Sequence, residues 1–204
     1  MEPMVAPDTS FRSQDAFTQA QFRAWMDRRP ASDPWHYELL RGRIVMSPPA
    51  RAIHGRVGAV VATAIETCVA RSRRGLVFDA STGFELPSGD TVEPDVSFVS
   101  SDRWRQAGEP GLRGFLPVVP DLVVETLSPS STTRDRVEKS AIYAANGVLE
   151  FWIVDPEARS VEVRSRRDGD WGEPVTSVAG RVASSLLPDL QLEVEDLFAG
   201  FARR

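Results

Sequence analysis

Two apolar segments, 121–127 and 149–154, stand on either side of a stretch with helical signals, and this arrangement restricts the fold more than any other feature. Segment 121–127 is apolar at nearly every position, which is typical of a central strand covered on both faces. A turn at 128–131 leads into a helix expected at 133–145, and an Asn-Gly pair ends that helix. A strand–helix–strand step places its two strands parallel in one sheet, with a right-handed crossover. We therefore predict an α/β fold, in which a mixed sheet carries helices on its faces.

The rest of the chain adds helices and hairpins to this unit. The clearest helix is 51–71, where apolar residues recur at helical spacing. Strands are expected at 76–79, 83–86 and 92–99, and 101–120 is expected to be a long loop with one helical turn. The other expected elements are a helix at 13–28 capped by Ser13, hairpins at 37–40/43–46 and 161–167/171–178, a strand at 190–194 and a helix at 195–198.

Charge and cysteine content narrow the function classes. The net charge of −5 argues against a general nucleic-acid-binding protein, because such domains usually carry a basic excess. Cys68 is the single cysteine, which excludes an internal disulfide and a cysteine-rich zinc site and favours a reducing cytoplasm. We find no apolar run long enough to span a bilayer and no signal peptide, so we expect no membrane partner. The 204 residues fit one domain at 13–204, after a disordered N-terminus at 1–12.

Two carboxylates occupy strand positions where acidic side chains are costly. Alternation along 121–127 places Glu125 on the same face as Leu127, in an apolar strand. Burying a lone carboxylate is unfavourable unless it is paired or binds a cation. Asp95 begins a second apolar strand, and two carboxylates on adjacent strands, with the Thr126 carbonyl as a third ligand, suit a hard cation such as Mg²⁺ or Mn²⁺. In the alternative interpretation, Asp95 and Glu125 cap turns or pair with arginines.

Lys139 is the one lysine among 24 basic residues, and it lies on the helix that follows Glu125. A compact ammonium and a planar guanidinium are not interchangeable in a buried acidic site. At helical spacing Val137 falls on the buried arc and Lys139 on its margin, from which its side chain can extend toward Glu125. A lysine in such a place is expected to contribute little to stability. The alternative is a surface lysine whose stem covers apolar neighbours.

Several segments closely follow one known family, and the block 120–156 is the most specific. They are Glu-Leu-Leu-Arg-Gly-Arg (38–43), Met-Ser-Pro-Pro with His54 (46–54), Glu-Pro-Asp-Val (93–96), Pro-Asp-Leu-Val-Val-Glu-Thr-Leu-Ser-Pro-Ser (120–130), Arg-Asp-Arg-Val-Glu-Lys (134–139) with Tyr143, and Gly-Val-Leu-Glu-Phe-Trp-Ile-Val-Asp-Pro (147–156). Over about residues 15 to 200 the chain resembles the Uma-type restriction endonucleases, a branch of the PD-(D/E)XK nuclease superfamily.

This resemblance implies a restriction-endonuclease-like αβββαβ core with added N-terminal and C-terminal hairpins. Asp95 fills the Pro-Asp position of the family pattern, and Glu125 fills the acidic position of the second motif. The lysine expected two residues after Glu125 is replaced by Leu127, so Lys139 would have to supply that charge from the helix.

The leading hypothesis is a Mg²⁺- or Mn²⁺-dependent endonuclease that hydrolyses DNA phosphodiester bonds. Asp95, Glu125 and Lys139 are the candidate catalytic residues, with the metal held by the two carboxylates. His54 and Glu38 are secondary candidates for contacting substrate or supporting the site. A lone histidine in an apolar helical stripe is, in the alternative interpretation, a core residue with its hydrogen bonds satisfied.

The nuclease hypothesis implies an assembly state, and two other functions compete with it. Cleavage of both DNA strands requires two sites related by a two-fold axis, so we expect a homodimer. Its interface is expected to use exposed aromatic residues of the terminal hairpins, namely Phe115, Trp171 or Phe198. The competing hypothesis is a catalytically silent interaction or scaffold protein with the nuclease fold, and a third is hydrolysis of a substrate other than DNA.

Overall fold

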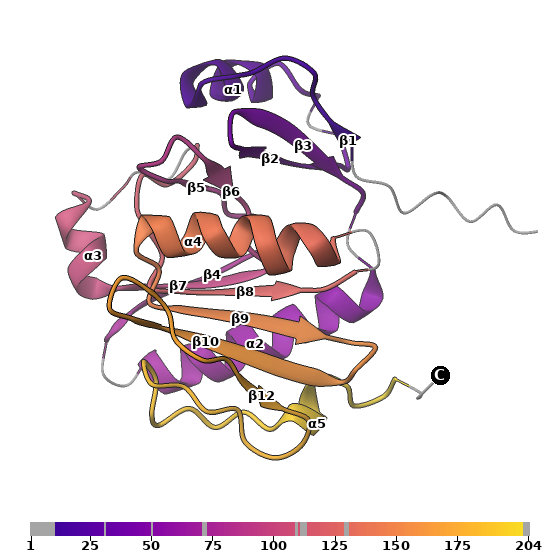
Figure 1. Ribbon diagram of the computed structural model, residues 1–204, viewed down its shortest axis with the longest axis vertical. Helices are drawn as coiled ribbons and strands as arrows, with labels where there is room; N and C mark the ends of the chain where they lie inside the picture. Colours follow the sequence, from indigo (N-terminus) through magenta and orange to yellow (C-terminus); the bar gives the residue numbers. More distant parts are fainter. Residues whose placement is uncertain are drawn as a thin grey trace, which may run out of the picture.

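The computed structural model describes residues 11–30, 32–49, 51–70, 73–108, 110, 114–128 and 131–201. The larger of two sheets consists of β4 (Gly75–Asp79), β7 (Val96–Ser100), β8 (Leu122–Thr126), β9 (Glu150–Asp155), β10 (Ser160–Arg167), β11 (Asp170–Trp171) and β12 (Val175–Ser177). Its order is β11-β10-β9-β8-β7-β4, with β12 also paired to β10. The smaller sheet consists of β1 (Phe11–Arg12), β2 (His36–Leu40), β3 (Arg43–Ser47), β5 (Phe84–Glu85) and β6 (Thr91–Val92), in the order β1-β3-β2-β6-β5. The helices are α1 (Gln19–Met26), α2 (Ala52–Ala70), α3 (Ser101–Gln106), the π-helix η1 (Arg134–Lys139), α4 (Ser140–Asn146) and α5 (Val194–Leu197) (Figure 1).

The strand–helix–strand step predicted for 121–154 is present. β8 and β9 pair in parallel, with Glu125 opposite Ile153, and η1 and α4 form the connection. Gly147 ends α4 with a left-handed backbone (φ 82°), a conformation that glycine adopts without strain. Because β7 pairs with β8 in the antiparallel sense, the sheet is mixed. The predicted α/β class is therefore confirmed.

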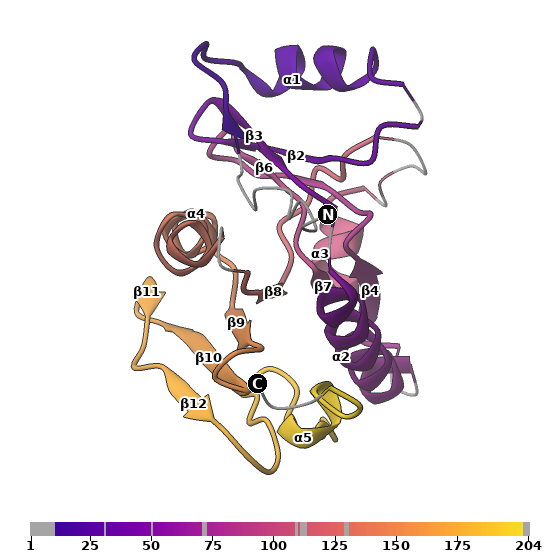
Figure 2. The ribbon, with the colours of Figure 1, turned by 90° about the vertical axis from the view of Figure 1, so that its right-hand side faces the viewer.

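Helices cover both faces of the larger sheet. α2 lies on one face and α4 on the other, with β7, β8 and β9 between them (Figure 2). Alternate residues of β8 face the two helices: Leu122 and Val124 pack in the cluster that contains the buried side of α2, whereas Val123 packs in the cluster under α4. Glu125 follows Val123 onto the α4 side by the same alternation, so an acidic side chain enters an apolar layer.

The smaller sheet and α1 lie above α4 in Figure 1 and supply part of the site. The segment 92–99, expected as one strand, is divided between the sheets, because β6 ends at Val92 and β7 begins at Val96. Pro94 lies between them and lacks the N–H that a continuous ladder would need. The segment predicted as a strand at 83–86 also joins the smaller sheet, as β5. The core with αβββαβ order consists of α2, β4, β7, β8, the η1–α4 helix and β9.

Two predictions at the N-terminal end require correction. The first helix begins after Thr18 and not after Ser13, because Thr18 and Gln21 form a capping box. Of the N-terminus expected to be disordered at 1–12, residues 1–10 lie outside the described part of the chain. Phe11–Arg12, by contrast, form β1 and pair with β3.

The predicted strand at 190–194 is also absent from the C-terminal segment. The β-pairing of segment 190–194 is one isolated antiparallel bridge between Glu193 and Arg181, and α5 begins at Val194. Apolar side chains of this segment, such as Leu190 and Leu192, are buried against the larger sheet. The alternation of apolar residues thus reflects packing on the core and not strand pairing.

The three aromatic residues expected at an exposed dimer interface pack within the chain instead. Phe198 is 1% exposed and belongs to the cluster around α2. Trp171 is partly buried against the cluster under α4, and its indole N–H donates to the Ser140 carbonyl at 3.0 Å. Phe115 stacks on Phe22, with ring centroids 5.4 Å apart. The expectation that these residues form an exposed surface is wrong.

By length and composition alone, α2 qualifies as a helix that could cross a membrane. The expectation that no apolar run reaches such a length is therefore wrong for this helix. Val57, Val61, Ile65 and Val69 on its inner face are fully buried against the larger sheet and the C-terminal segment. Packing as a core helix accounts for this apolar stripe.

Candidate active site

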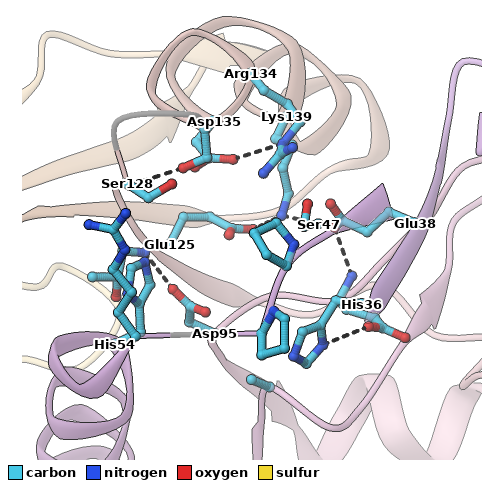
Figure 3. A pocket seen from close by; sticks show the side chains of 17 residues that line it. His36, Glu38, Ser47, His54, Asp95, Glu125, Ser128, Arg134, Asp135 and Lys139 are labelled. Carbon is cyan, nitrogen blue, oxygen red and sulfur yellow. Dashed lines mark hydrogen bonds and ion pairs between the residues drawn. The ribbon is translucent and has the colours of Figure 1, made fainter. Parts of the chain in front are cut away.

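A cleft of about 110 Å³ opens where the two sheets meet the η1 end of the crossover helix (Figure 3). Its walls come from β2, the start of α2, the link between β6 and β7, the end of β8, and η1. At roughly 30 Å³ per water molecule, this volume holds a few waters or a small hydrated ion. Five carboxylates line the cleft: Glu38, Glu93, Asp95, Glu125 and Asp135.

Glu125 lies in β8, and Asp95 directly precedes the neighbouring strand β7. β7 and β8 are antiparallel with Val96 opposite Val124, so one further step places Asp95 opposite Glu125. Directly opposed residues project from the same face of a sheet, with Cβ atoms about 4.5–5.5 Å apart. Asp95 is half-buried, and its Oδ2 accepts a hydrogen bond from the Thr126 N–H at 2.6 Å. The structure thus brings the two candidate carboxylates together at the end of β8.

Lys139 reaches the same place from the helix. Its Nζ lies 2.9 Å from Glu38 Oε1 and forms an ion pair with Glu125 Oε1. The lysine is only 2% exposed, whereas Val137 is 64% exposed, so the predicted burial of the two residues is wrong. The buried residues Asp135, Lys139 and Tyr143 recur at a spacing of four, so the helical period holds. The inward side of η1 carries charged side chains where an apolar arc was expected. The expectation that Lys139 contributes little to stability assumed a position at the helix margin, which the structure contradicts. We expect a buried ammonium between two carboxylates to be costly to remove.

Glu38 enters the cleft from the smaller sheet. Leu40, two residues further along β2, packs in the cluster under α4, so Glu38 projects from the same face of the strand. Its Oε1 accepts a hydrogen bond from the Glu93 N–H at 3.0 Å. Burial opposes ionisation, but Lys139 and the Glu93 N–H help to hold the pKa of Glu38 below its usual value. This carboxylate is therefore the ionised partner of the lysine.

Glu125 is held by two partners on one oxygen atom. Tyr143 is fully buried and donates its hydroxyl to Glu125 Oε1 at 2.5 Å, and Lys139 pairs with the same oxygen. A cation that binds Glu125 would therefore use Oε2. Burial raises the pKa of Glu125 to about 8, against the opposing effect of Lys139 and with the help of neighbouring carboxylates. Burial alone would lower the pKa of Lys139, but Glu125 and Glu38 raise it above its usual value, so the lysine stays charged.

A histidine–carboxylate pair at the cleft was not predicted from the sequence. His36 Nδ1 lies 3.4 Å from Glu93 Oε2, and this contact raises the pKa of His36 above its ordinary value. Burial raises the pKa of Glu93. The Glu-Pro-Asp segment gave a signal for Glu93, but no pattern distinguished His36, because the pair forms only when β2 and the β6–β7 link come together.

His54, one of the two secondary candidates, lines the cleft from the first turn of α2 (Figure 3). Its Nδ1 is buried and has no hydrogen-bond partner within the described ranges. The alternative of a core histidine with satisfied hydrogen bonds does not fit this environment. Glu38, the other secondary candidate, is part of the charged cluster around Lys139.

Unpaired buried polar atoms concentrate at this cleft. Seven buried side-chain nitrogen or oxygen atoms of the described residues lack a hydrogen-bond partner, and five of them belong to cleft residues, namely His54, Thr126, Asp135 and, with two atoms, Arg134. Leaving such an atom unpaired costs about 1–3 kcal/mol, and folded proteins therefore contain few of them. Their concentration in one place is typical of a site that pairs them with a ligand.

The oxygen donors of the cleft match a hard cation in composition. Within the described part of the chain, no group of three or more His, Cys, Asp or Glu side chains is arranged to hold a metal ion. The expected donor set is smaller: the two carboxylates and the Thr126 carbonyl. Each carboxylate uses one oxygen for the contacts described above and retains acceptor capacity on the other. Mg²⁺ often binds through one or two carboxylates and keeps several waters, so a donor set of this size is compatible with the ion.

Comparisons with known proteins identify a family and a shared fold. The Uma2 family, described as "Putative restriction endonuclease", matches residues 19–195. Among solved structures, a protein described as "a putative nuclease belonging to DUF820" from Anabaena variabilis ATCC 29413 superposes with a TM-score of 0.73. The two chains are 19% identical over 90% of this chain and 98% of that chain, so this likeness shows a shared fold. A comparison with curated proteins found no match.

Proposed function

The chain belongs to the Uma2 family of restriction endonuclease-like proteins, and on this premise we propose that it hydrolyses DNA phosphodiester bonds with the help of Mg²⁺ or Mn²⁺. Asp95, Glu125 and the Thr126 carbonyl would hold the cation. The supporting observation is the ion pair between Lys139 and Glu125, because it places a helix lysine beside a strand carboxylate in the cleft that Asp95 also lines. Carboxylates that can hold a cation, with a positive charge beside them, suit metal-assisted phosphodiester cleavage.

The residues of the chain have separable roles in this proposal. When bound, a divalent cation polarises the phosphate and lowers the pKa of an attacking water. Tyr143 fixes one oxygen of Glu125, which orients the carboxylate toward the cleft. Lys139 keeps Glu125 and Glu38 in place and supplies positive charge beside the position of the reacting phosphate. His54 presents an unpaired ring nitrogen to the cleft and is suited to a substrate contact.

The test is a Mg²⁺ and Mn²⁺ titration of the purified protein against supercoiled plasmid and single-stranded DNA. We expect cleavage that depends on the cation and that falls at least about 100-fold in Asp95→Asn and Glu125→Gln, since even residues that only orient metal ligands contribute roughly 10–100-fold. Glu150→Gln is a matched control. Glu150 is also a buried strand carboxylate, but its partners are groups such as the Ser185 N–H, away from the cleft.

The outcomes separate the candidate functions. Wild-type protein that cleaves neither DNA with either cation, yet binds the cation, would favour the silent scaffold or a substrate other than DNA. Equal activity in Asp95→Asn, Glu125→Gln and the wild type would place any activity in another protein of the preparation and contradict the proposal.

Assembly and location are further parts of this proposal. We expect a homodimer, because cleavage of both strands requires two sites, and light scattering at micromolar concentration tests it. A monomer would leave nicking of one strand as the activity. A cytoplasmic location is consistent with a DNA substrate and with Cys68, the single cysteine.

A further inference from the structure

Arg134 is the first residue of η1, and its side chain lines the cleft above Asp135 and Lys139 (Figure 3). Its side chain is 14% exposed, and its Nε lies 3.5 Å from Asp135 Oδ1. This is a loose contact, beyond the 2.7–2.9 Å that is typical of a charge-assisted hydrogen bond between nitrogen and oxygen. Arg134 therefore approaches the candidate site without being fixed by a well-formed ion pair.

The guanidinium of Arg134 has donors that the protein does not use. Its Nε and Nη1 are buried and have no hydrogen-bond partner within the described ranges. Asp135 Oδ1, which Arg134 Nε faces at 3.5 Å, likewise has no well-formed hydrogen bond among the residues that the structure describes. A guanidinium has five N–H groups in a planar fork, and a purely structural arginine would be expected to place the buried ones on acceptors.

The unused N–H donors of Arg134 suit an anionic ligand that carries oxygen atoms, and a cation bound beside them would offset the repulsion from the surrounding carboxylates. Arg134 lies in the electrostatic field of Glu38, Asp135 and Glu125, and the last of these is the proposed cation ligand. A phosphodiester bound near that cation would bring non-bridging oxygens beside the guanidinium. Arginine recognises phosphate with two parallel N–H bonds, a geometry that lysine cannot reproduce.

We propose that Arg134 is a substrate-binding residue whose guanidinium holds a DNA phosphate in the cleft. The proposal rests on the nuclease function proposed above, which it deepens by assigning the contact that captures the negatively charged backbone. It differs from a structural role, in which Arg134 only offsets the charge of the carboxylates around it.

The experiment measures the affinity of a fluorescein-labelled 20-base-pair DNA duplex by anisotropy in Ca²⁺, over a series of salt concentrations. Arg134→Gln should weaken binding roughly 10- to 100-fold, the effect of losing a charge-assisted hydrogen bond. It should also reduce the slope of log K against log salt by about 0.9, the contribution of one phosphate contact on duplex DNA. Arg134→Lys keeps the charge and should restore the slope while recovering only part of the affinity.

Arg105→Gln is the matched control, since it removes the same charge from an exposed arginine of α3 that pairs with Asp102 outside the cleft. It should leave affinity and salt slope unchanged. If Arg134 only offsets the charge of the carboxylates around it, Arg134→Gln should leave the salt slope of duplex binding unchanged.

A salt slope equal to that of the wild type in folded Arg134→Gln would overturn the inference, as would a wild type that does not bind the duplex at all. Duplex binding with the expected loss in Arg134→Gln, but without cleavage in Mg²⁺ or Mn²⁺, would support Arg134 while contradicting the nuclease function. The two proposals can therefore fail separately.

Discussion

Replacing Lys139 by methionine probes the buried charge cluster that Lys139 forms with Glu38 and Glu125. Methionine keeps most of the side-chain volume but removes the ammonium, which leaves two carboxylates, 6% and 5% exposed, beside each other. Removing one partner of a buried ion pair costs about 3–5 kcal/mol, because the remaining charge is uncompensated. We expect Lys139→Met to lower the free energy of unfolding by this amount at pH 8, as measured by urea denaturation.

The pH dependence of the lost free energy of unfolding shows whether Lys139→Met acts through charge or through packing. Without Lys139 the pKa values of Glu38 and Glu125 in the folded protein rise, because burial then acts without an opposing cation. A carboxyl group whose folded pKa is raised favours folding below its unfolded pKa, and that contribution is lost as the pH rises through the folded value. The difference between wild type and Lys139→Met should therefore be smaller at pH 5 than at pH 8.

Two further variants complete this test. Adding Glu125→Gln to Lys139→Met removes one of the two uncompensated charges and should recover part of the lost stability, as in a double-mutant cycle. Lys139→Arg should lose activity almost as completely as Lys139→Met, because the planar fork does not fit between the two carboxylates. A free energy of unfolding for Lys139→Met within about 0.5 kcal/mol of the wild type would refute the reasoning, since that is the range of ordinary surface substitutions.

Three other expectations follow from the same structure. Tyr143→Phe removes the hydroxyl that fixes Glu125 Oε1 and should raise the Mg²⁺ concentration needed for half-maximal cleavage, as measured by Mg²⁺ titration. In a protein that already carries Glu125→Gln, Tyr143→Phe should have no additional effect. Because the pKa of Glu125 is raised from 4.5 to about 8, the free energy of unfolding should fall as the pH rises through that interval, and Mg²⁺ should reduce this fall by favouring the ionised carboxylate; a urea-denaturation series that shows no change would contradict the assignment. Glu150→Gln should lower thermal stability, because Glu150 accepts hydrogen bonds from the Ser185 N–H and the Trp152 indole. At temperatures where the variant is folded it should cleave as the wild type does, and a folded Glu150→Gln protein without cleavage activity would contradict the separate roles of Glu150 and Glu125.

The strand positions of the candidate site follow from local sequence. Period-two alternation placed Glu125 on one face of an apolar strand, and the structure puts it there, on the α4 side of β8. The start of an apolar strand at Asp95 was equally visible, and antiparallel pairing brings that residue opposite Glu125. Both inferences rest on the geometry of single strands, which varies little with context.

The helix positions could not be predicted in the same way. Taking the apolar side of the helix as the buried one places Val137 inside and Lys139 at the margin, but the structure turns the side that carries Asp135 and Lys139 inward. The cost of burying Lys139 is offset by Glu38, which comes from a hairpin about a hundred residues earlier in the chain. No local pattern contains that contact, since it depends on how the smaller sheet packs on α4.

Long-range packing also decided the remaining corrections. Phe198 and Trp171 are large apolar residues near turns, where a sequence pattern does not indicate which neighbours cover them. His36 and Glu93 meet across two segments of the smaller sheet and its link to β7. Such contacts become visible only when the tertiary arrangement is known.

The most direct test of the proposed active site is the position of a bound cation. Crystals grown or soaked with Mn²⁺ allow the ion to be located by its anomalous scattering, independently of any activity. We expect an anomalous peak in the cleft with oxygens of Asp95 and Glu125 at about 2.1 Å, a distance typical of small divalent cations, and no such peak in Glu125→Gln. A cleft that stays empty at millimolar Mn²⁺, or a peak held by other carboxylates in both proteins, would contradict the assignment of Asp95, Glu125 and Lys139 as the active site.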